Sequence, residues 1–291
     1  MTSLNFQPII VQPENYAKAL LINSFSLALV FACIYLPLLG VFVFKAVRNP
    51  TYVLWITAFF CQVRVVSFAM RAALAKSATA GQNFDLVLSQ QIIYGVGFFG
   101  ILYSAYIMVL DREFIKGTAG HSPLSRITGN RHLIRLALVA AVSLSITGAV
   151  MANTGTKQNT IDLGKQLRTA SVVIFLVVAA FLVIHIMFSI STEMRNTSGE
   201  KVQNSLAPYG LHILLLAGLF LLVREIFFVA TNNKTTQYKE RLFYPFAACT
   251  ELAAVLLFLS PGLIPLKREL AEASRVGSYV SPSSYSFAPT Y

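Results

Sequence analysis

Long apolar stretches alternate with short polar ones along almost the whole chain. A helix needs about 20 mostly apolar residues to cross the hydrocarbon core of a bilayer. Seven stretches meet this requirement, at residues 19–44, 52–73, 90–110, 134–152, 169–190, 209–230 and 243–266. The segments between them are rich in Gly, Asn, Thr and Lys, and unpaired backbone groups cannot remain in lipid, so we expect these segments to be loops. The pattern therefore predicts an all-α, seven-transmembrane helical bundle.

The two ends of the chain differ from this middle part. Residues 1–17 are polar and are expected to form a short extracellular N-tail, without a cleavable signal peptide, because the first apolar run is too long for one. Residues 18–268 form the predicted seven-helix membrane domain. Residues 269–291 are small, polar and dotted with tyrosines, which predicts a disordered cytoplasmic C-tail.

The distribution of Lys and Arg predicts the orientation of the bundle. About twelve of these residues fall on one predicted face and nine on the other. By the positive-inside rule the N-terminus lies outside and the C-terminus in the cytoplasm. The sequon at Asn233 then falls in an outer loop, where it is a glycosylation candidate. We expect an integral membrane protein of the plasma membrane or another secretory-route membrane.

Composition supports the membrane class and narrows the partners. The 291 residues are 56% hydrophobic and 12% charged, with a mean hydropathy of +0.65. The net charge of +11 does not indicate nucleic acid, because the basic residues are scattered and form no basic-aromatic module. They fit an interaction with anionic membrane lipids. Cys33, Cys61 and Cys249 all lie in apolar runs, which disfavours a disulfide or a zinc site, and we expect no metal.

Four ionisable residues lie well inside the predicted spans: Arg64, Arg224, Glu225 and Glu251. Each costs about 2.5–3.5 kcal/mol at a helix centre on insertion scales, so such residues normally face the bundle interior and pair. Counted from the outer ends of their spans at about 1.5 Å per residue, all four fall at a similar depth. Two positive and two negative charges permit full neutralisation.

The expected partners follow from helix geometry. Adjacent helix residues point about 100° apart, so we expect Arg224 and Glu225 to contact different neighbours. Arg224 is predicted to pair with Glu251, and Glu225 with Arg64. Two interpretations stay open. The ion pairs either hold the bundle in register, or they line an outward cavity that binds a charged head group.

A second polar level is predicted near the inner face. His185 and His212 lie at similar depth on consecutive helices, which raises the alternatives of two ordinary core histidines or a proton-linked site. Asp111, Arg112 and Glu113 close the third helix, at a position where G-protein-coupled receptors carry Asp-Arg-Tyr.

Several function classes lack their signatures. No Walker or dinucleotide glycine pattern is present, and neither a metal cluster nor a nucleophile elbow is visible. We therefore expect that the protein is not an enzyme, that it has no catalytic residues and no cofactor, and that it is not an ATP-driven pump. Retinal is excluded because residues 243–266 contain no lysine.

Three helices carry a family resemblance. The sixth reads Arg224-Glu225-Ile226-Phe227-Phe228, followed by the segment from Glu240 to Phe246 that contains Tyr244, and then by Pro261-Gly262. The second reads RVVSFAMR from Arg64 to Arg71, and the third ends in AYIMVLDR. These motifs resemble those of the fungal lipid-translocating exporter family of the resistance-to-aminocholesterol type. Arg64 stands where that family has a glutamate, Phe228 replaces its second arginine, and Glu251 is an addition.

The resemblance implies a fungal seven-helix protein linked to lipid asymmetry or to stress from membrane-active compounds. It adds Arg71, Glu240 and Tyr244 to the polar positions of interest. A lipid or amphiphile translocator, or a resistance-type transporter, is the first hypothesis, with a lipid or amphiphilic small molecule as ligand. A seven-helix receptor or sensor, with a G protein as a possible partner, is the second. A scaffold whose ion pairs only fix packing is the third.

Overall fold

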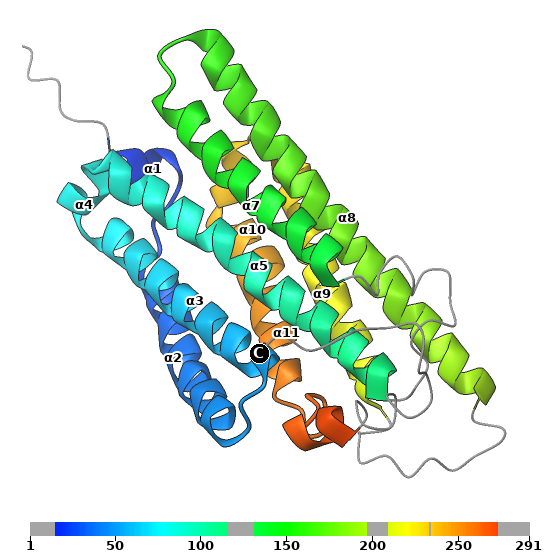
Figure 1. Cartoon of the computed structure of the whole chain (residues 1–291). Helices are drawn as coiled ribbons and strands as arrows, with labels where there is room; N and C mark the ends of the chain where they lie inside the picture. Colours follow the sequence, from blue (N-terminus) through cyan, green and yellow to red (C-terminus); the bar gives the residue numbers. More distant parts are fainter. Residues whose placement is uncertain (1–14, 116–130, 197–208, 233, 273–291) are drawn as a thin grey trace, which may run out of the picture.

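The computed structural model describes residues 15–115, 131–196, 209–232 and 234–272, and every regular element in them is helical. Seven helices are long and apolar enough to cross a membrane, which confirms the predicted all-α seven-helix bundle (Figure 1). They are α2 (Phe25–Arg48), α3 (Tyr52–Lys76), α5 (Phe84–Ile115), α7 (Arg131–Thr154), α8 (Gln158–Asn196), α9 (Gly210–Thr231) and a composite last helix. The composite helix consists of α10 (Glu240–Phe243), the π-helical segment η2 (Tyr244–Cys249) and α11 (Thr250–Phe258).

The bundle has two ends that recur below. One end carries the short helices α1 (Tyr16–Ala19) and α4 (Ala78–Gln82), the α7–α8 turn and the 3-10 turn η1 (Thr235–Tyr238) (Figure 1). We call it the α1 end. The α2–α3 turn and the residues after α11 lie at the other end. The positive-inside bias predicts that the α1 end faces outside.

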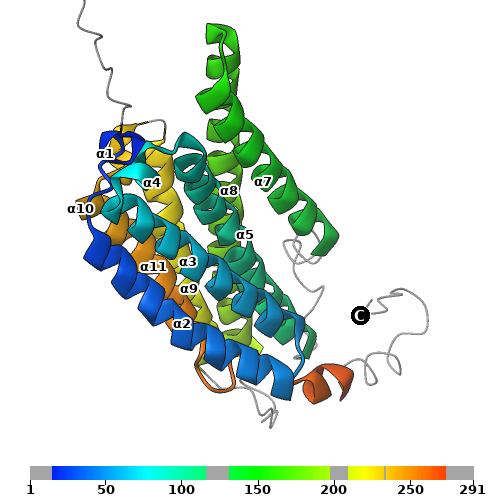
Figure 2. The same ribbon diagram turned by 90° about the vertical axis from the view of Figure 1, so that its left-hand side faces the viewer.

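Helix α5 is the centre of the bundle (Figure 2). In its most apolar stretch 72% of the residues are buried, against 28% in α2 and 22% in α7. Large apolar side chains on the outer helices stay exposed, among them Leu36 and Phe44 on α2 and Leu136 on α7. This is the distribution expected of a bundle whose perimeter faces lipid and whose centre faces protein.

Two helices extend well beyond their apolar cores. Helix α5 begins at Phe84 rather than near residue 90, and α8 begins at Gln158 rather than near residue 169. The two segments before these spans, which were expected to be loops, are therefore largely helical. Polar residues of the first turns of α8 interact with each other, as Gln158 Nε2 donates to Asp162 Oδ1 at 3.0 Å. Such pairs at four-residue spacing keep a polar segment helical outside the apolar region.

The α7–α8 hairpin is packed backbone to backbone through two glycines. A Cβ at Gly164 of α8 would lie 2.4 Å from the backbone nitrogen of Ala152 on α7. A Cβ at Gly148 of α7 would lie 2.7 Å from the backbone nitrogen of Arg168. Small residues permit this close approach, as is common where membrane helices associate. The contact fixes the position of Arg168 relative to α7.

The last helix contains a local irregularity just before Glu251. Pro245 has no backbone N–H and cannot donate the usual helical bond, and the chain forms a π-helical segment from Tyr244 to Cys249. A regular α-helix resumes at Thr250.

Candidate functional site: a buried charge cluster beside a small cavity

The four intramembrane ionisable residues meet in one cluster between α3, α9 and α11. Arg64 Nη2 lies 2.7 Å from Glu251 Oε1, and Arg224 Nε lies 2.9 Å from the same oxygen. Arg224 Nη1 also pairs with Glu225 Oε1. Arg64 and Glu251 are fully buried, and Arg224 and Glu225 are buried almost completely. We call these four residues the charge cluster, and its formal charge is zero.

The pairing within the cluster differs in part from the prediction. The Arg224–Glu251 pair is confirmed. The predicted Glu225–Arg64 pair is wrong, because Arg64 binds Glu251 and Glu225 binds its own neighbour Arg224. The geometric rule failed because it compares directions at the backbone. An arginine side chain is long enough to turn along the helix surface and bring its guanidinium back to an adjacent carboxylate.

Aromatic rings of α5 and α9 enclose the two arginines of the cluster. The Arg64 guanidinium carbon lies 4.0 Å from the ring centre of Tyr94, and that of Arg224 lies 3.9 Å from Phe98 and 4.1 Å from Phe228. Arg64 Nη1 also donates to the backbone carbonyl of Tyr94 at 2.7 Å. Ring faces attract cations in a dry environment, so the rings stabilise the cluster in addition to the ion pairs.

A glycine on α5 makes room for this arrangement. A Cβ at Gly97 would lie 3.1 Å from Arg64 Nη1, so the guanidinium occupies space that any other residue would fill. The sequence reasoning missed both Tyr94 and Gly97. The signal that was available is the pair of glycines in Tyr94-Gly95-Val96-Gly97, in the middle of an apolar helix.

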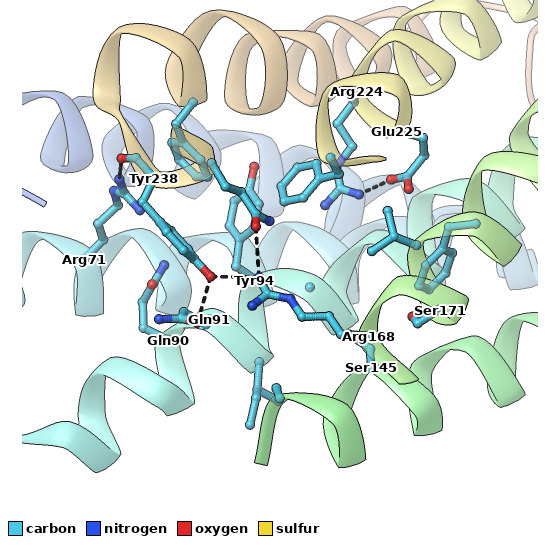
Figure 3. Close-up of a pocket in the computed structure, with 18 residues that line it drawn as sticks. Arg71, Gln90, Gln91, Tyr94, Ser145, Arg168, Ser171, Arg224, Glu225 and Tyr238 are labelled. Atoms are coloured by element: carbon cyan, nitrogen blue, oxygen red, sulfur yellow. Dashed lines mark hydrogen bonds and ion pairs between the residues drawn. The ribbon is translucent and has the colours of Figure 1, made fainter. Parts of the chain in front are cut away.

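A cavity of about 70 Å³, lined by both polar and apolar side chains, lies between the charge cluster and η1 (Figure 3). Arg224 and Glu225 form one wall, and Gln237 and Tyr238 contribute from η1. The polar side chains that line the rest of the cavity come from α3, α5, α7 and α8: Arg71, Gln90, Gln91, Ser145, Arg168 and Ser171. This volume is far below the few hundred Å³ of a pocket for a drug-sized ligand. The space suffices for a few water molecules or a small polar group.

Two further arginines are held at the cavity by one tyrosine. Arg168 Nη2 donates to the Tyr238 hydroxyl at 2.8 Å and to Gln237 Oε1 at 3.0 Å. Arg71 Nη2 contacts the backbone carbonyl of Tyr238 at 3.4 Å, and the Tyr238 hydroxyl donates to Gln91 Oε1 at 2.8 Å. Figure 3 shows Arg71 and Arg168 on the two sides of Tyr238. We call Arg71 and Arg168 the arginine pair.

Most of this second group was missed by the sequence reasoning. Arg71 was a position of interest only through the family resemblance, and Arg168, Gln91, Gln237 and Tyr238 were assigned to loops or passed over. What these residues share in the sequence is their position at the outer edge of an apolar span. Polar residues are also found at this position in ordinary helix ends.

The second polar level has a structural role at the end opposite α1. Arg112 is buried, and its Nη2 and Nε donate to the carbonyls of Gly262 and Leu263 at 2.7 and 3.2 Å. Lys45 Nζ donates to the carbonyl of Leu259 at 3.1 Å. Both cations therefore satisfy carbonyls at and after the end of the last helix, where the helix dipole favours positive charge. Asp111, next to Arg112, is buried as well.

The two histidines do not form a common site. His185 is buried on α8, and its Nε2 lies 2.9 Å from Glu113 Oε1, which also accepts a hydrogen bond from Ser189. His212 is exposed on α9. The alternative of a proton-linked pair arose from similar depth, but depth does not determine the direction of a side chain around its helix axis.

Glu240 and Tyr244, the remaining polar positions, hold the α1 end together. Glu240 Oε1 accepts from the backbone nitrogens of Asn23 and Ser24 at 2.8 and 2.5 Å, and the Ser24 hydroxyl donates to Oε2. Glu240 thereby caps the N-terminus of α2 from the last helix. Tyr244 is buried and stacks on Phe31 of α2 with ring centres 5.4 Å apart. Asn233 lies outside the described residues.

Comparisons with known proteins add no assignment. No family model, no curated protein and no solved structure matches the chain. The class is therefore defined by fold and site alone, as a multispanning seven-helix membrane protein with a neutral buried charge cluster beside a small cavity. The resemblance to the lipid-translocating exporter family stays a hypothesis.

Proposed function

We propose that this protein is a lipid or amphiphile translocator that binds the head group of its substrate inside the helical bundle. The observation that carries the proposal is the cavity itself, in which charged and polar side chains meet next to the charge cluster among seven apolar helices. Ionisable residues inside membrane spans are costly and mark substrate pathways more often than not. A bundle that needed only tight packing would fill this space with apolar side chains.

The size of the cavity limits what the substrate can place there. About 70 Å³ accommodates a small head group, whereas a whole drug-sized molecule requires a pocket of a few hundred Å³. The apolar part of the substrate would therefore stay among the lipid chains outside the bundle. The motifs in α3, α9 and the composite last helix resemble those of the exporter family, and this resemblance supports the same function. We place the protein in the plasma membrane or another membrane of the secretory route.

The test blocks the cavity without changing any charge. Ser145 lines the cavity from α7, and Ser145→Leu adds bulk at that wall. Ser143 lies two residues earlier and is exposed, so Ser143→Leu is a matched control on the same helix. Full-length protein is reconstituted into vesicles, and the movement of a fluorescent phospholipid between leaflets is measured.

We expect Ser145→Leu to slow lipid movement at least about tenfold, since a group that no longer fits loses more than about 1.4 kcal/mol of binding. Ser143→Leu should move lipid like the unchanged protein. Normal movement by a correctly folded Ser145→Leu protein would count against translocation through this cavity.

A receptor or sensor is the second candidate function. It is favoured by the small volume of the cavity, since a site that only recognises a small group needs no pathway across the membrane. This candidate predicts that a G-protein alpha subunit co-purifies with the full chain. It also predicts that changes in the loop at residues 116–130, which lies outside the described residues, abolish this coupling.

A further inference from the structure

The charges around the cavity do not cancel. The charge cluster is neutral by itself, with Arg64 and Arg224 balanced by Glu225 and Glu251. Arg71 and Arg168 also line the cavity, and within the described part of the chain no carboxylate lies in ion-pair distance of either. The cavity therefore carries two positive charges that no described acidic side chain neutralises.

Neutral groups hold the arginine pair in place. The partners of Arg168 are the side chains of Gln237 and Tyr238, and Arg71 contacts the Tyr238 carbonyl and lies over the ring of Phe243 at 4.1 Å. These partners fix the direction of both guanidiniums without reducing their charge. Tyr238 joins the two, with its carbonyl on one arginine and its hydroxyl on the other.

Arg71 is buried and can donate a further hydrogen bond. Its side chain is only 1% exposed, and its Nε has no hydrogen-bond partner. A buried charge without a counter-charge is unfavourable by several kcal/mol, so proteins normally pair such groups or use them to bind a ligand.

The nearby acidic residues are already engaged or turned away. Glu240 caps α2, Asp162 lies 3.7 Å from Lys165, and Asp85 is exposed in the first turn of α5. None of these carboxylates lines the cavity. The missing negative charge is therefore expected to come from a bound molecule.

We infer that the cavity binds a phosphate group, which the guanidiniums of Arg71 and Arg168 attract from the two sides of Tyr238. Guanidinium forks match the oxygens of phosphate and donate two parallel hydrogen bonds to them. A phosphate with two negative charges neutralises the arginine pair, and its size fits a cavity of about 70 Å³. This inference rests on the proposed function and names its substrate class as an amphiphile with a phosphate head group. A free phosphate ion offers the same chemistry.

The experiment measures binding to the full-length protein in a non-ionic detergent by isothermal titration. Three probes separate the sources: dihexanoyl phosphatidic acid carries the phosphate on a short lipid, dihexanoylglycerol lacks it, and sodium phosphate lacks the lipid. The test variant is Arg168→Gln. Position 168 is half-buried, and glutamine keeps a polar side chain there. The matched control is Lys165→Gln on the same helix, which removes the same charge from an exposed site.

We expect dihexanoyl phosphatidic acid to bind, and Arg168→Gln to weaken its binding at least about tenfold, because the variant loses charge-assisted hydrogen bonds to the phosphate. Lys165→Gln should bind like the unchanged protein. Similar dependence of sodium phosphate on Arg168 identifies free phosphate as sufficient, and binding of the lipid phosphate alone identifies a head group. Arg71→Gln serves as a second variant, and Arg168→Gln decides alone should Arg71→Gln fail to fold.

The inference is overturned by any of three results: neither phosphate probe binds, Arg168→Gln binds unchanged, or dihexanoylglycerol binds as well as dihexanoyl phosphatidic acid. These results are distinguishable from a failure of translocation. Phosphate binding without lipid movement in vesicles leaves the anion site in place and removes the transport proposal. Lipid movement that persists while no phosphate probe binds leaves the transport proposal in place and removes the anion site.

Discussion

Two groups of arginines lie within the same part of the bundle, and they have opposite surroundings. Arg64 and Arg224, in the charge cluster, bind carboxylates and are covered by aromatic rings. Arg71 and Arg168, in the arginine pair, bind a carbonyl, an amide and a hydroxyl beside a cavity. The charges of the first group cancel, whereas within the described residues no carboxylate pairs with either arginine of the second.

The comparison shows that a buried charge indicates function only after its partners are counted. The charge cluster was the more conspicuous candidate in the sequence, because its members stand in the middle of apolar helices. Its closed geometry fits a packing device that fixes α3, α9 and α11 relative to each other. The arginine pair is less conspicuous, and it is the group whose charge remains unbalanced. The two groups should therefore respond differently to substitution.

The largest effect is expected for Glu251→Gln. Glu251 Oε1 binds both Arg64 and Arg224, so this change leaves the cluster with a net positive charge in a fully buried place. Breaking a buried pair on one side is unfavourable by about 3–5 kcal/mol. We expect a large fall in the thermal midpoint of the detergent-solubilised protein, or failure to accumulate in the membrane.

A double variant sharpens this prediction. Arg64→Gln combined with Glu251→Gln removes one charge of each sign and leaves the Arg224–Glu225 pair. The double variant should be more stable than Glu251→Gln alone, because the cluster is neutral again. Equal stability of Glu251→Gln and the unchanged protein would show that the cluster has no structural role.

A smaller effect is expected for Gly164→Ala. The added Cβ would meet the Ala152 backbone at 2.4 Å, so α7 and α8 must separate. Overpacking of this kind is unfavourable by about 1–3 kcal/mol. Because Arg168 lies one helical turn further along α8, the change should also weaken phosphate binding while the charge cluster remains intact.

The control for this variant is Gly40→Ala on α2, where an added Cβ meets no atom within 4 Å. Gly40→Ala should leave both the thermal midpoint and phosphate binding close to those of the unchanged protein. If Gly164→Ala matches this control in both measurements, the hairpin contact does not position Arg168.

The smallest stability effect is expected for Arg168→Gln. Its removal relieves an unbalanced charge, and glutamine keeps a hydrogen-bonding group near Gln237 and Tyr238. We expect a change of less than about 1 kcal/mol in stability without ligand, in the range of ordinary substitutions away from buried networks.

Arg224→Gln should destabilise strongly, since it leaves Glu225 without its partner. Equal thermal midpoints for these two variants would remove the distinction between the two groups.

The fold was predictable because it depends on a simple quantity. The length and apolarity of a segment determine whether it can span a bilayer, and all seven expected spans are helices. The ends of helices were not predictable from the same quantity. The first turns of α8 are polar, and a local side-chain pair accompanies their helical form. At the start of α5, the Asn83 side chain accepts a hydrogen bond from the backbone N–H of Leu86.

The site was predictable only in part. Similar depth in the bundle was enough to place Arg64, Arg224, Glu225 and Glu251 together. Similar depth was not enough to predict the pairs within the cluster, because these depend on how far a flexible arginine side chain turns. The consequence is practical, since an exchange of Arg224 and Glu251 would bring a new arginine next to Arg64. Such an exchange therefore does not separate packing from ligand binding.

The cavity could not be found from sequence spacing. Its residues come from α3, α5, α7, α8 and η1, and the Tyr238 that connects Arg71 to Arg168 lies in a short turn. Residues of this kind also occur at ordinary helix ends, and only their convergence in space distinguishes them.

The most direct measurement is a high-resolution electron cryomicroscopy map of the full chain in nanodiscs that contain phosphatidic acid. We predict density for a phosphate group in the cavity, in contact with the guanidiniums of Arg71 and Arg168, beside a charge cluster that keeps its own pairs. A cavity that holds only water, with both guanidiniums turned toward carboxylates of the protein itself, would contradict the proposed binding of a phosphate head group.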